Sequence, residues 1–103
     1  MGLFSFFTGG SSLKDALRKG AVIIDVRTPQ EFDNGKVPGS INIPVDRIAA
    51  NAERIKNMHK PVIFCCEAGF RSRTAAHIMK EHGLKDVYAG GNWEKVLRAI
   101  NSL

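Results

Sequence analysis

The sequence predicts an α/β fold in which helices flank a mostly parallel central sheet. Three short apolar runs, 21–24, 62–65 and 87–89, have the composition and the turn-forming boundaries of buried strands. Segments with helically spaced apolar residues separate these runs, and strands that alternate with helices are typical of parallel sheets. The chain has 103 residues, enough for one modest core, so we expect a single domain over 1–103.

The N-terminal segment 1–10 is apolar but short. No positive charge precedes its phenylalanines, as one would in an export signal, so we expect an edge strand or a flexible segment here. Ser12 then precedes an apolar stripe that Gly20 ends, which predicts a short helix. No apolar run approaches the roughly 20 residues that cross a bilayer. We therefore expect a cytoplasmic protein without a membrane span.

The middle of the chain contains clear helix and strand signals. The first apolar strand is expected to extend to Arg27, and Thr28 followed by Pro29 predicts a helix with threonine as its N-cap. The alternating segment 41–43 predicts a brief strand before a proline. Asp46 is expected to cap a further helix, whose buried face would hold Ile48, Ala52 and Ile55.

The second half repeats the alternation of strand and helix. The strand 62–65 is followed by a tight turn at 67–70 and by a helix from about Arg71 to Gly83. After the third strand, the pair 90–91 predicts a turn into a last helix. That helix has one apolar stripe, formed by Trp93, Val96, Leu97 and Ile100.

Two adjacent cysteines, Cys65 and Cys66, are the residues whose chemistry needs an explanation. Neighbouring side chains of a strand point to opposite faces, so the two thiols do not readily pair, and Cys65 is expected in the core. No cysteine or histidine spacing is typical of a metal site. Cys66 ends a strand, where parallel sheets bind ligands, and Gly69 lets the following turn direct N–H groups at one point. The positive end of the next helix adds to this cradle, which favours the nucleophilic thiolate of Cys66 without metal or cofactor.

Several segments resemble, in the correct order, the signatures of the rhodanese homology family. Residues 25–32 (DVRTPQEF) resemble its first signature and 35–44 (GKVPGSINIP) the continuation of that signature. Residues 66–72 (CEAGFRS) resemble its active-site loop and 90–93 (GGNW) its closing segment. The resemblance extends over 13–103 and implies a three-layer rhodanese-like domain.

The resemblance implies a sulfurtransferase that carries a sulfane sulfur as a persulfide on Cys66 and works by a ping-pong mechanism. Thiosulfate or another small anionic donor would load Cys66, and a thiol or cyanide would accept the sulfur. A sulfur-relay protein is a further candidate partner, and no cofactor is expected. The six-residue loop from Cys66 to Arg71 has the length associated with sulfane-sulfur transfer in the family. The expected loop and anion cradle comprise Glu67, Ala68, Gly69, Phe70, Arg71 and Ser72.

Two supporting residues are expected at the neighbouring strand end. Asp25 is expected to orient a loop arginine and Arg27 to reach an anionic donor, with a purely structural salt bridge as the alternative. Glu67 should repel a dianion, which argues against thiosulfate as the donor. Phe70 at the tip of the loop is either a docking contact or a partly buried residue that shapes the loop.

Two other functions compete with this one. Cysteine phosphatases and arsenate reductases use Cys-x5-Arg-Ser/Thr loops, and five residues do separate Cys65 from Arg71. In that alignment, however, Ala68 stands where the loop glycine is expected, and the loop counted from Cys66 is too short to wrap a phosphate. A non-catalytic binding or regulatory module is the second alternative. The formal charge of +5 favours small anions, but the basic residues are scattered and form no nucleic-acid-binding motif.

Overall fold

The computed structural model describes residues 9–103, with side chains from Leu13 onward. Four parallel strands form one sheet in the order β2-β1-β3-β4. The strands are β1 (Val22–Asp25), β2 (Ile41–Asn42), β3 (Val62–Cys66) and β4 (Val87–Asn92). The predicted α/β class with a parallel sheet is confirmed, and the carboxyl ends of all four strands lie at one edge.

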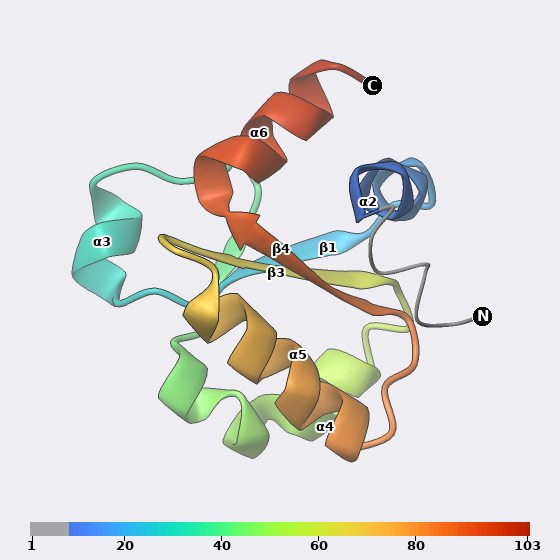
Figure 1. Cartoon of the computed structure of the whole chain (residues 1–103). Helices are drawn as coiled ribbons and strands as arrows, with labels where there is room; N and C mark the ends of the chain where they lie inside the picture. The colour runs from blue at the N-terminus through green and yellow to red at the C-terminus, as the bar shows by residue number, and fades with distance from the viewer. Residues whose placement is uncertain (1–8) are drawn as a thin grey trace.

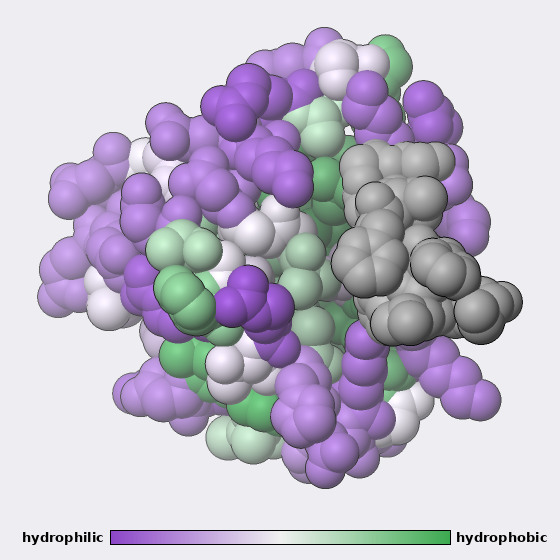
Figure 2. Space-filling model, in the orientation of Figure 1, coloured by the Kyte–Doolittle hydropathy of each residue, from purple (hydrophilic) through white to green (hydrophobic). Residues whose placement is uncertain are grey.

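Helices cover both faces of the sheet and give the three layers that the resemblance implies (Figure 1). On one face lie α2 (Gly9–Arg18) and α6 (Trp93–Asn101), and on the other lie α4 (Ala52–Lys56) and α5 (Phe70–Glu81). The short α3 (Pro29–Asp33) stands beyond the carboxyl ends of the strands. In the same view the surface is mostly hydrophilic, and apolar residues show chiefly in a recess between α6 and α5 (Figure 2).

The expected edge strand or flexible segment at 1–10 lies mostly outside the described residues, which begin at Gly9. Residues 9 and 10 belong to α2, so the helix starts before Ser12 rather than after it. Glycine and serine do not prevent a helical backbone, and the apolar stripe alone does not fix where a helix begins. Gly20 ends the helix as predicted, with a φ of +83°. The N–H groups of Gly20 and Ala21 donate to carbonyls of the last turn at 3.0 and 3.1 Å.

The alternation of side chains along β3 separates the two cysteines, as predicted. Ile63 and Cys65 pack among side chains of α2 and α6. Phe64 and Cys66 pack among side chains of α4 and α5. Both cysteines are completely buried free thiols. One residue of spacing therefore places the two sulfur atoms in different cores.

The start of α3 follows the sequence prediction closely. Thr28 is the N-cap, its hydroxyl accepts the N–H of Glu31 at 3.2 Å, and Pro29 occupies the first turn. The Glu31 carboxylate in turn accepts the N–H of Thr28 at 3.0 Å, which completes a capping box. This reciprocal pair fixes where the Glu31 side chain points.

The single helix expected after Asp46 is wrong. Two 3-10 turns, Val45–Arg47 and Ala49–Asn51, precede α4, and Asp46 lies inside the first turn without capping it. The apolar spacing was informative, because the predicted face is buried. The same spacing is satisfied by tight i→i+3 turns, so it does not distinguish them from an α-helix. The buried residues of this face are Ile48, Ala52 and Ile55.

The turn expected at 90–91 is also wrong, because β4 continues through both glycines to Asn92. Phe64 pairs with Ala89 and Cys65 with Gly91, so Gly90 is an extra residue in a β-bulge. A Cβ atom on Gly90 would lie 2.8 Å from Ile63 Cγ2 and 3.0 Å from Phe64 O. Glycine is therefore required here by close approach, and the bulge brings Asn92 beside Cys66.

Candidate active site

Cys66 ends β3, and the loop that leads into α5 encloses its sulfur atom. The backbone N–H of Gly69 donates to Cys66 Sγ at 3.0 Å, and the N–H of Ser72 donates at 3.4 Å. Gly69 has a φ of +98°, a conformation that a side chain would strain. Ser72 Oγ donates to Gly69 O at 2.9 Å and holds the loop closed. The arrangement is a cradle of N–H donors around one sulfur atom.

This cradle stabilises negative charge on sulfur. The first N–H groups of α5 have no acceptor within the helix, and the helix dipole adds a positive potential at this end. Cys65 lies in the opposite environment, since burial and then the charge of Asp25 raise the pKa of its thiol. Cys65 therefore remains protonated at neutral pH. Of the two cysteines, Cys66 has the surroundings of a nucleophile.

Arg71 binds a carboxylate of α3. Its Nη1 donates to Glu31 Oε1 at 2.8 Å and its Nη2 to Glu31 Oε2 at 3.0 Å, a bidentate pair. Arg71 and the backbone N–H of Thr28 lower the pKa of Glu31 to about 2. Glu31 therefore connects α5 to α3, and the same side chain completes the capping box at the start of α3. Sequence reasoning did not select Glu31 for the site, although its position in the capping box after Thr28 is visible in the sequence.

Asp25 and Arg27 form a buried salt bridge with each other, the arrangement that is the alternative to their predicted supporting roles. Asp25 is completely buried and Arg27 is 3% exposed. The Asp25 carboxylate accepts from Arg27 Nη2 at 2.7 Å and from Arg27 Nε at 3.0 and 3.1 Å. It also accepts the backbone N–H of Arg27 at 3.0 Å, which turns it back onto its own strand rather than toward a loop arginine.

The remaining contacts of Arg27 hold it inside the protein. Its Nη2 donates to Gly35 O at 2.6 Å, and its Nη1 donates to Glu31 O at 3.3 Å. The guanidinium carbon lies 5.0 Å from the centroid of the Trp93 ring. Each of the three guanidinium nitrogens of Arg27 therefore donates to a protein oxygen. Its guanidinium therefore joins β1, α3 and α6.

Glu67, directly after the nucleophile, has its carboxylate at the surface. Its side chain is 57% exposed, and its Oε1 lies 3.7 Å from Arg27 Nη1. Its backbone carbonyl accepts from Asn92 Nδ2 at 2.8 Å, while Asn92 Oδ1 caps α6 by accepting the N–H of Lys95. Asn92 thus couples the loop to α6. Sequence reasoning named it only as part of the segment 90–93.

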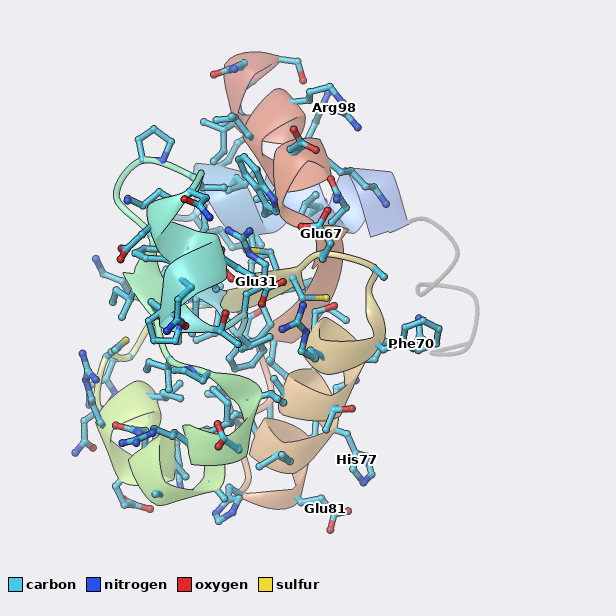
Figure 3. The ribbon with its side chains drawn as sticks, turned by 90° about the vertical axis from the view of Figure 1, so that its left-hand side faces the viewer. Glu31, Glu67, Phe70, His77, Glu81 and Arg98 are labelled. Carbon is cyan, nitrogen blue, oxygen red and sulfur yellow. The ribbon has the colours of Figure 1, made fainter. Side chains whose placement is uncertain are left out.

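The other loop residues lie at the surface. Ala68 is exposed, and Phe70 is 68% exposed, which rules out a partly buried Phe70. The Arg73 guanidinium stacks on the Phe70 ring, with its carbon 4.9 Å from the ring centroid. Figure 3 shows Glu31 and Glu67 at one side of the loop and Phe70 projecting away at the other. The loop therefore has carboxylates on one side and an exposed aromatic ring on the other.

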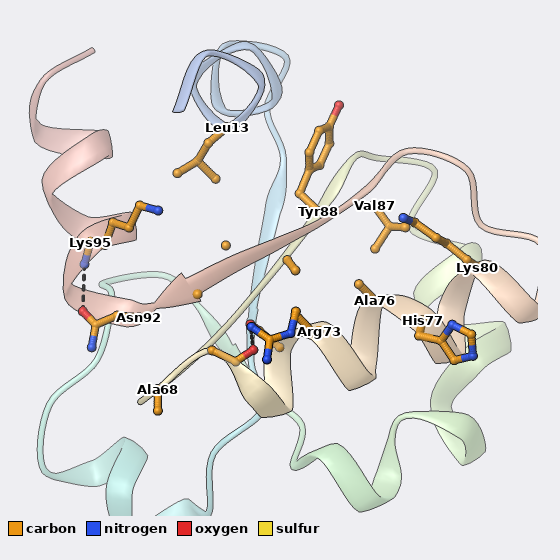
Figure 4. A pocket seen from close by; sticks show the side chains of 15 residues that line it. Leu13, Ala68, Arg73, Ala76, His77, Lys80, Val87, Tyr88, Asn92 and Lys95 are labelled. Atoms are coloured by element: carbon orange, nitrogen blue, oxygen red, sulfur yellow. Dashed lines mark hydrogen bonds between the residues drawn. The ribbon is translucent and has the colours of Figure 1, made fainter. Parts of the chain in front are cut away.

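A hollow flanks the loop on each side. The smaller one, of about 330 Å³, is lined by Arg27 and Trp93 and by three carboxylates, those of Glu31, Glu67 and Glu94. The larger one, of about 650 Å³, lies between α5 and β4 and contains basic side chains (Figure 4). Within residues 9–103, no group of three or more His, Cys, Asp or Glu side chains is arranged to hold a metal ion. The same residues include no helix long and apolar enough to cross a membrane.

Comparisons with known proteins agree with this geometry. The chain matches the family model of the rhodanese-like domain over residues 10–95. Thiosulfate sulfurtransferase GlpE of Pseudomonas syringae pv. syringae is 37% identical over 75 residues, which cover 72% of this chain and 70% of GlpE. YqhL of Bacillus subtilis is 35% identical over 68 residues, or 66% of this chain and 53% of YqhL, so the match spans about half of that relative. A solved structure of a rhodanese with anions from E. coli has a TM-score of 0.67 and 30% identity, covering 73% of this chain and 89% of that chain.

Proposed function

Because the chain belongs to the rhodanese-like domain family, we propose that it is a sulfurtransferase whose nucleophile is Cys66. Its relative GlpE is named a thiosulfate sulfurtransferase. The single observation that carries the proposal is the cradle, in which the N–H groups of Gly69 and Ser72 point at one sulfur atom. Such donors stabilise the thiolate that attacks and the anionic persulfide that results.

The proposed reaction has two half-reactions, as in ping-pong catalysis. The Cys66 thiolate attacks the outer sulfur of a sulfane donor, the bond between the donor's two sulfur atoms breaks, and the donor leaves with the electron pair of that bond. Cys66 then carries a persulfide. An acceptor thiolate or cyanide attacks the outer sulfur, and Cys66 leaves as the thiolate that began the cycle. Neither half-reaction needs an external oxidant or reductant.

Access to the sulfur differs between the two half-reactions. Cys66 is completely buried, so the donor reaches it only when the loop moves, and the exposed Glu67 and Ala68 form the outer part of that loop. A persulfide places its outer sulfur about 2 Å beyond Cys66 Sγ, the length of a sulfur–sulfur bond. The loaded form is therefore easier for an acceptor to reach than the empty form is for a donor.

The charges around the smaller hollow favour a thiol persulfide over thiosulfate as the donor. Arg27 and Arg71, the arginines that would hold a dianion, are bound to Asp25 and Glu31. The hollow also contains Glu67, whose carboxylate is exposed. A doubly charged donor would be repelled here, whereas the persulfide of an otherwise neutral small thiol carries at most one negative charge.

Mass spectrometry of the intact protein tests the sulfur-carrier proposal. After exposure to thiosulfate or to glutathione persulfide, the protein should gain one sulfur, and peptide mapping should locate it on Cys66. Cys66→Ser should abolish the gain, whereas Cys65→Ser, the matched control, should retain it. Failure of every sulfane donor to load Cys66 would refute the proposal and leave the non-catalytic module.

The phosphatase alternative is tested on the same preparations. Hydrolysis of an aryl phosphate without any sulfur transfer would replace the sulfurtransferase assignment. We also propose that the protein works in the cytoplasm, where the reduced state of Cys65 and Cys66 is maintained and low-molecular-weight persulfides are available.

A further inference from the structure

The larger hollow beside the loop is a groove between α5 and β4 with basic side chains along it. We call it the basic groove and define it by Arg73, His77 and Lys80 of α5 and Lys95 of α6. Figure 4 shows the three α5 side chains following one another along the helix, with Lys95 across from them. Every residue of β4, from Val87 to Asn92, contributes to the lining, so the groove follows the direction of an extended chain.

The basic groove and the cradle of Cys66 share residues. Ala68, Gly69 and Ser72 belong to the loop around the sulfur and also line the groove. Asn92, which binds the carbonyl of Glu67, lines the same end. A segment lying in the groove would therefore end beside the loop that encloses the sulfur of Cys66.

The ionisable side chains that define the groove are all basic. No Asp or Glu is among the described residues that line it. Glu81 lies 3.9 Å from His77 outside the lining, and the charges of Asp86 and Asp15 act on Tyr88 at the end remote from the loop. At the loop end, Arg73 is stacked on the exposed ring of Phe70. Aromatic and arginine side chains together at a binding surface are typical of protein contacts.

We propose that the basic groove binds an extended, acidic segment of a partner protein that presents an acceptor cysteine to the persulfide of Cys66. This inference rests on the proposed sulfurtransferase function and adds the chemistry of the acceptor. The charge of the groove selects acidic residues, and its course along β4 selects an extended backbone. The acceptor atom has to be a nucleophile such as a thiolate, which a peptide carries and an unmodified nucleic acid does not.

The transfer itself balances without a further reagent. The thiolate of the acceptor cysteine attacks the outer sulfur of the Cys66 persulfide and forms a new sulfur–sulfur bond. The bond between the outer sulfur and Cys66 Sγ breaks, and Cys66 leaves as a thiolate. The sulfane sulfur passes to the acceptor together with its negative charge, and the acceptor becomes the persulfide.

Synthetic peptides provide the test. Three short peptides differ only in whether their single cysteine is flanked by glutamates, serines or lysines, and each accepts sulfur from the full-length protein loaded on Cys66. The readout is the ratio of kcat/KM for the acidic peptide to kcat/KM for the serine peptide. This ratio cancels any change in the reactivity of Cys66 itself. We expect a ratio well above one that falls as salt is added.

Two double variants test whether the preference for the acidic peptide arises in the groove. The double variant Arg73→Gln with Lys95→Gln removes two positive charges from the groove, and the loss of each charge should lower the ratio by roughly two- to fivefold. Arg47→Gln with Arg54→Gln, the matched control, removes two exposed positive charges outside the groove lining and should leave the ratio unchanged.

Three outcomes would overturn the inference. A ratio near one in the unaltered protein would mean that something other than an acidic segment covers the groove, such as a second copy of the chain or its own residues 1–8. Equal losses in the groove and control variants would mean that only the net charge matters. Tighter binding of single-stranded RNA than of the acidic peptide would also overturn it, in favour of nucleic acid. In each case loading of Cys66 would still be seen by mass spectrometry, so the failure is distinct from failure of the proposed function.

Discussion

Asp25→Asn tests the conclusion that the Asp25–Arg27 pair is structural. The substitution keeps the shape of the side chain but removes the charge that compensates Arg27, a residue that is 3% exposed. Asp25 accepts four hydrogen bonds from Arg27, one from its backbone and three from its side chain. Breaking a buried ion pair on one side typically costs about 3–5 kcal/mol, because the other charge is left without its partner.

This cost is large for a chain of this size. Domains are usually stable by about 5–15 kcal/mol, and each kcal/mol shifts the Tm of a domain with about 100 residues by roughly 4–8 °C. We therefore expect the Tm of Asp25→Asn to fall by at least roughly 12 °C. Urea denaturation should show a lower midpoint with an unchanged slope, since the surface exposed on unfolding is the same.

A double-mutant cycle separates the pair from its surroundings. Arg27→Met alone should also destabilise, because it leaves the Asp25 charge buried and unpaired. The loss in the double variant should be smaller than the sum of the single losses by roughly 1–3 kcal/mol. Additive losses, or a loss below about 1 kcal/mol for Asp25→Asn, would refute the account of a coupled buried pair.

Three further predictions concern the loop. Gly69→Ala should reduce kcat for sulfur transfer by roughly tenfold or more, because a side chain at a φ of +98° displaces the N–H that faces Cys66 Sγ; normal turnover of this variant would contradict the cradle. Glu67→Gln should raise kcat/KM with thiosulfate by roughly two- to fivefold in a thiocyanate assay, with no such gain for an uncharged donor, and equal changes for both donors would exclude charge as the cause. Glu31→Gln should lower stability at neutral pH by about 1 kcal/mol at most, since Glu31 is about one-third exposed. The pKa of Glu31 is lowered from 4.5 to about 2, so its contribution is present above about pH 4.5 and is lost as the pH falls through about 2. The stability difference should therefore shrink in acid, and urea denaturation that shows the same difference at pH 2 and pH 7 would count against the Arg71 pair as its cause.

The elements that the sequence predicts well are those specified by near neighbours. Thr28, Pro29 and Glu31 form the start of α3 through contacts within four residues. The position of Cys66 at the end of a buried strand follows in the same way, from an apolar run that stops at a glycine-containing turn. Local chemistry of this kind needs no knowledge of how the strands pair.

Features that depend on pairing between distant segments could not be predicted in this way. The bulge at Gly90 exists because β4 shifts register against β3 after Phe64, and nothing local to the two glycines distinguishes a bulge from a turn. The partner of Arg71 lies 40 residues away in sequence, on α3. Asp25 was expected to face the loop because it ends a strand, but its contact with the N–H of Arg27 depends on the exact path of the backbone.

The opposite orientation of the two cysteines has a consequence for how the chain tolerates change. Which sulfur reacts is set by the parity of β3, that is, by whether a position is odd or even along the strand. Deleting one residue within β3, with its amino end held in register against β1, would exchange the faces of all later side chains and put Glu67 at the position of Cys66. No sulfur atom would then lie at the cradle, although both cysteines would remain in the sequence. Two thiols side by side thus provide no redundancy against such a deletion, which should be as damaging as removal of Cys66.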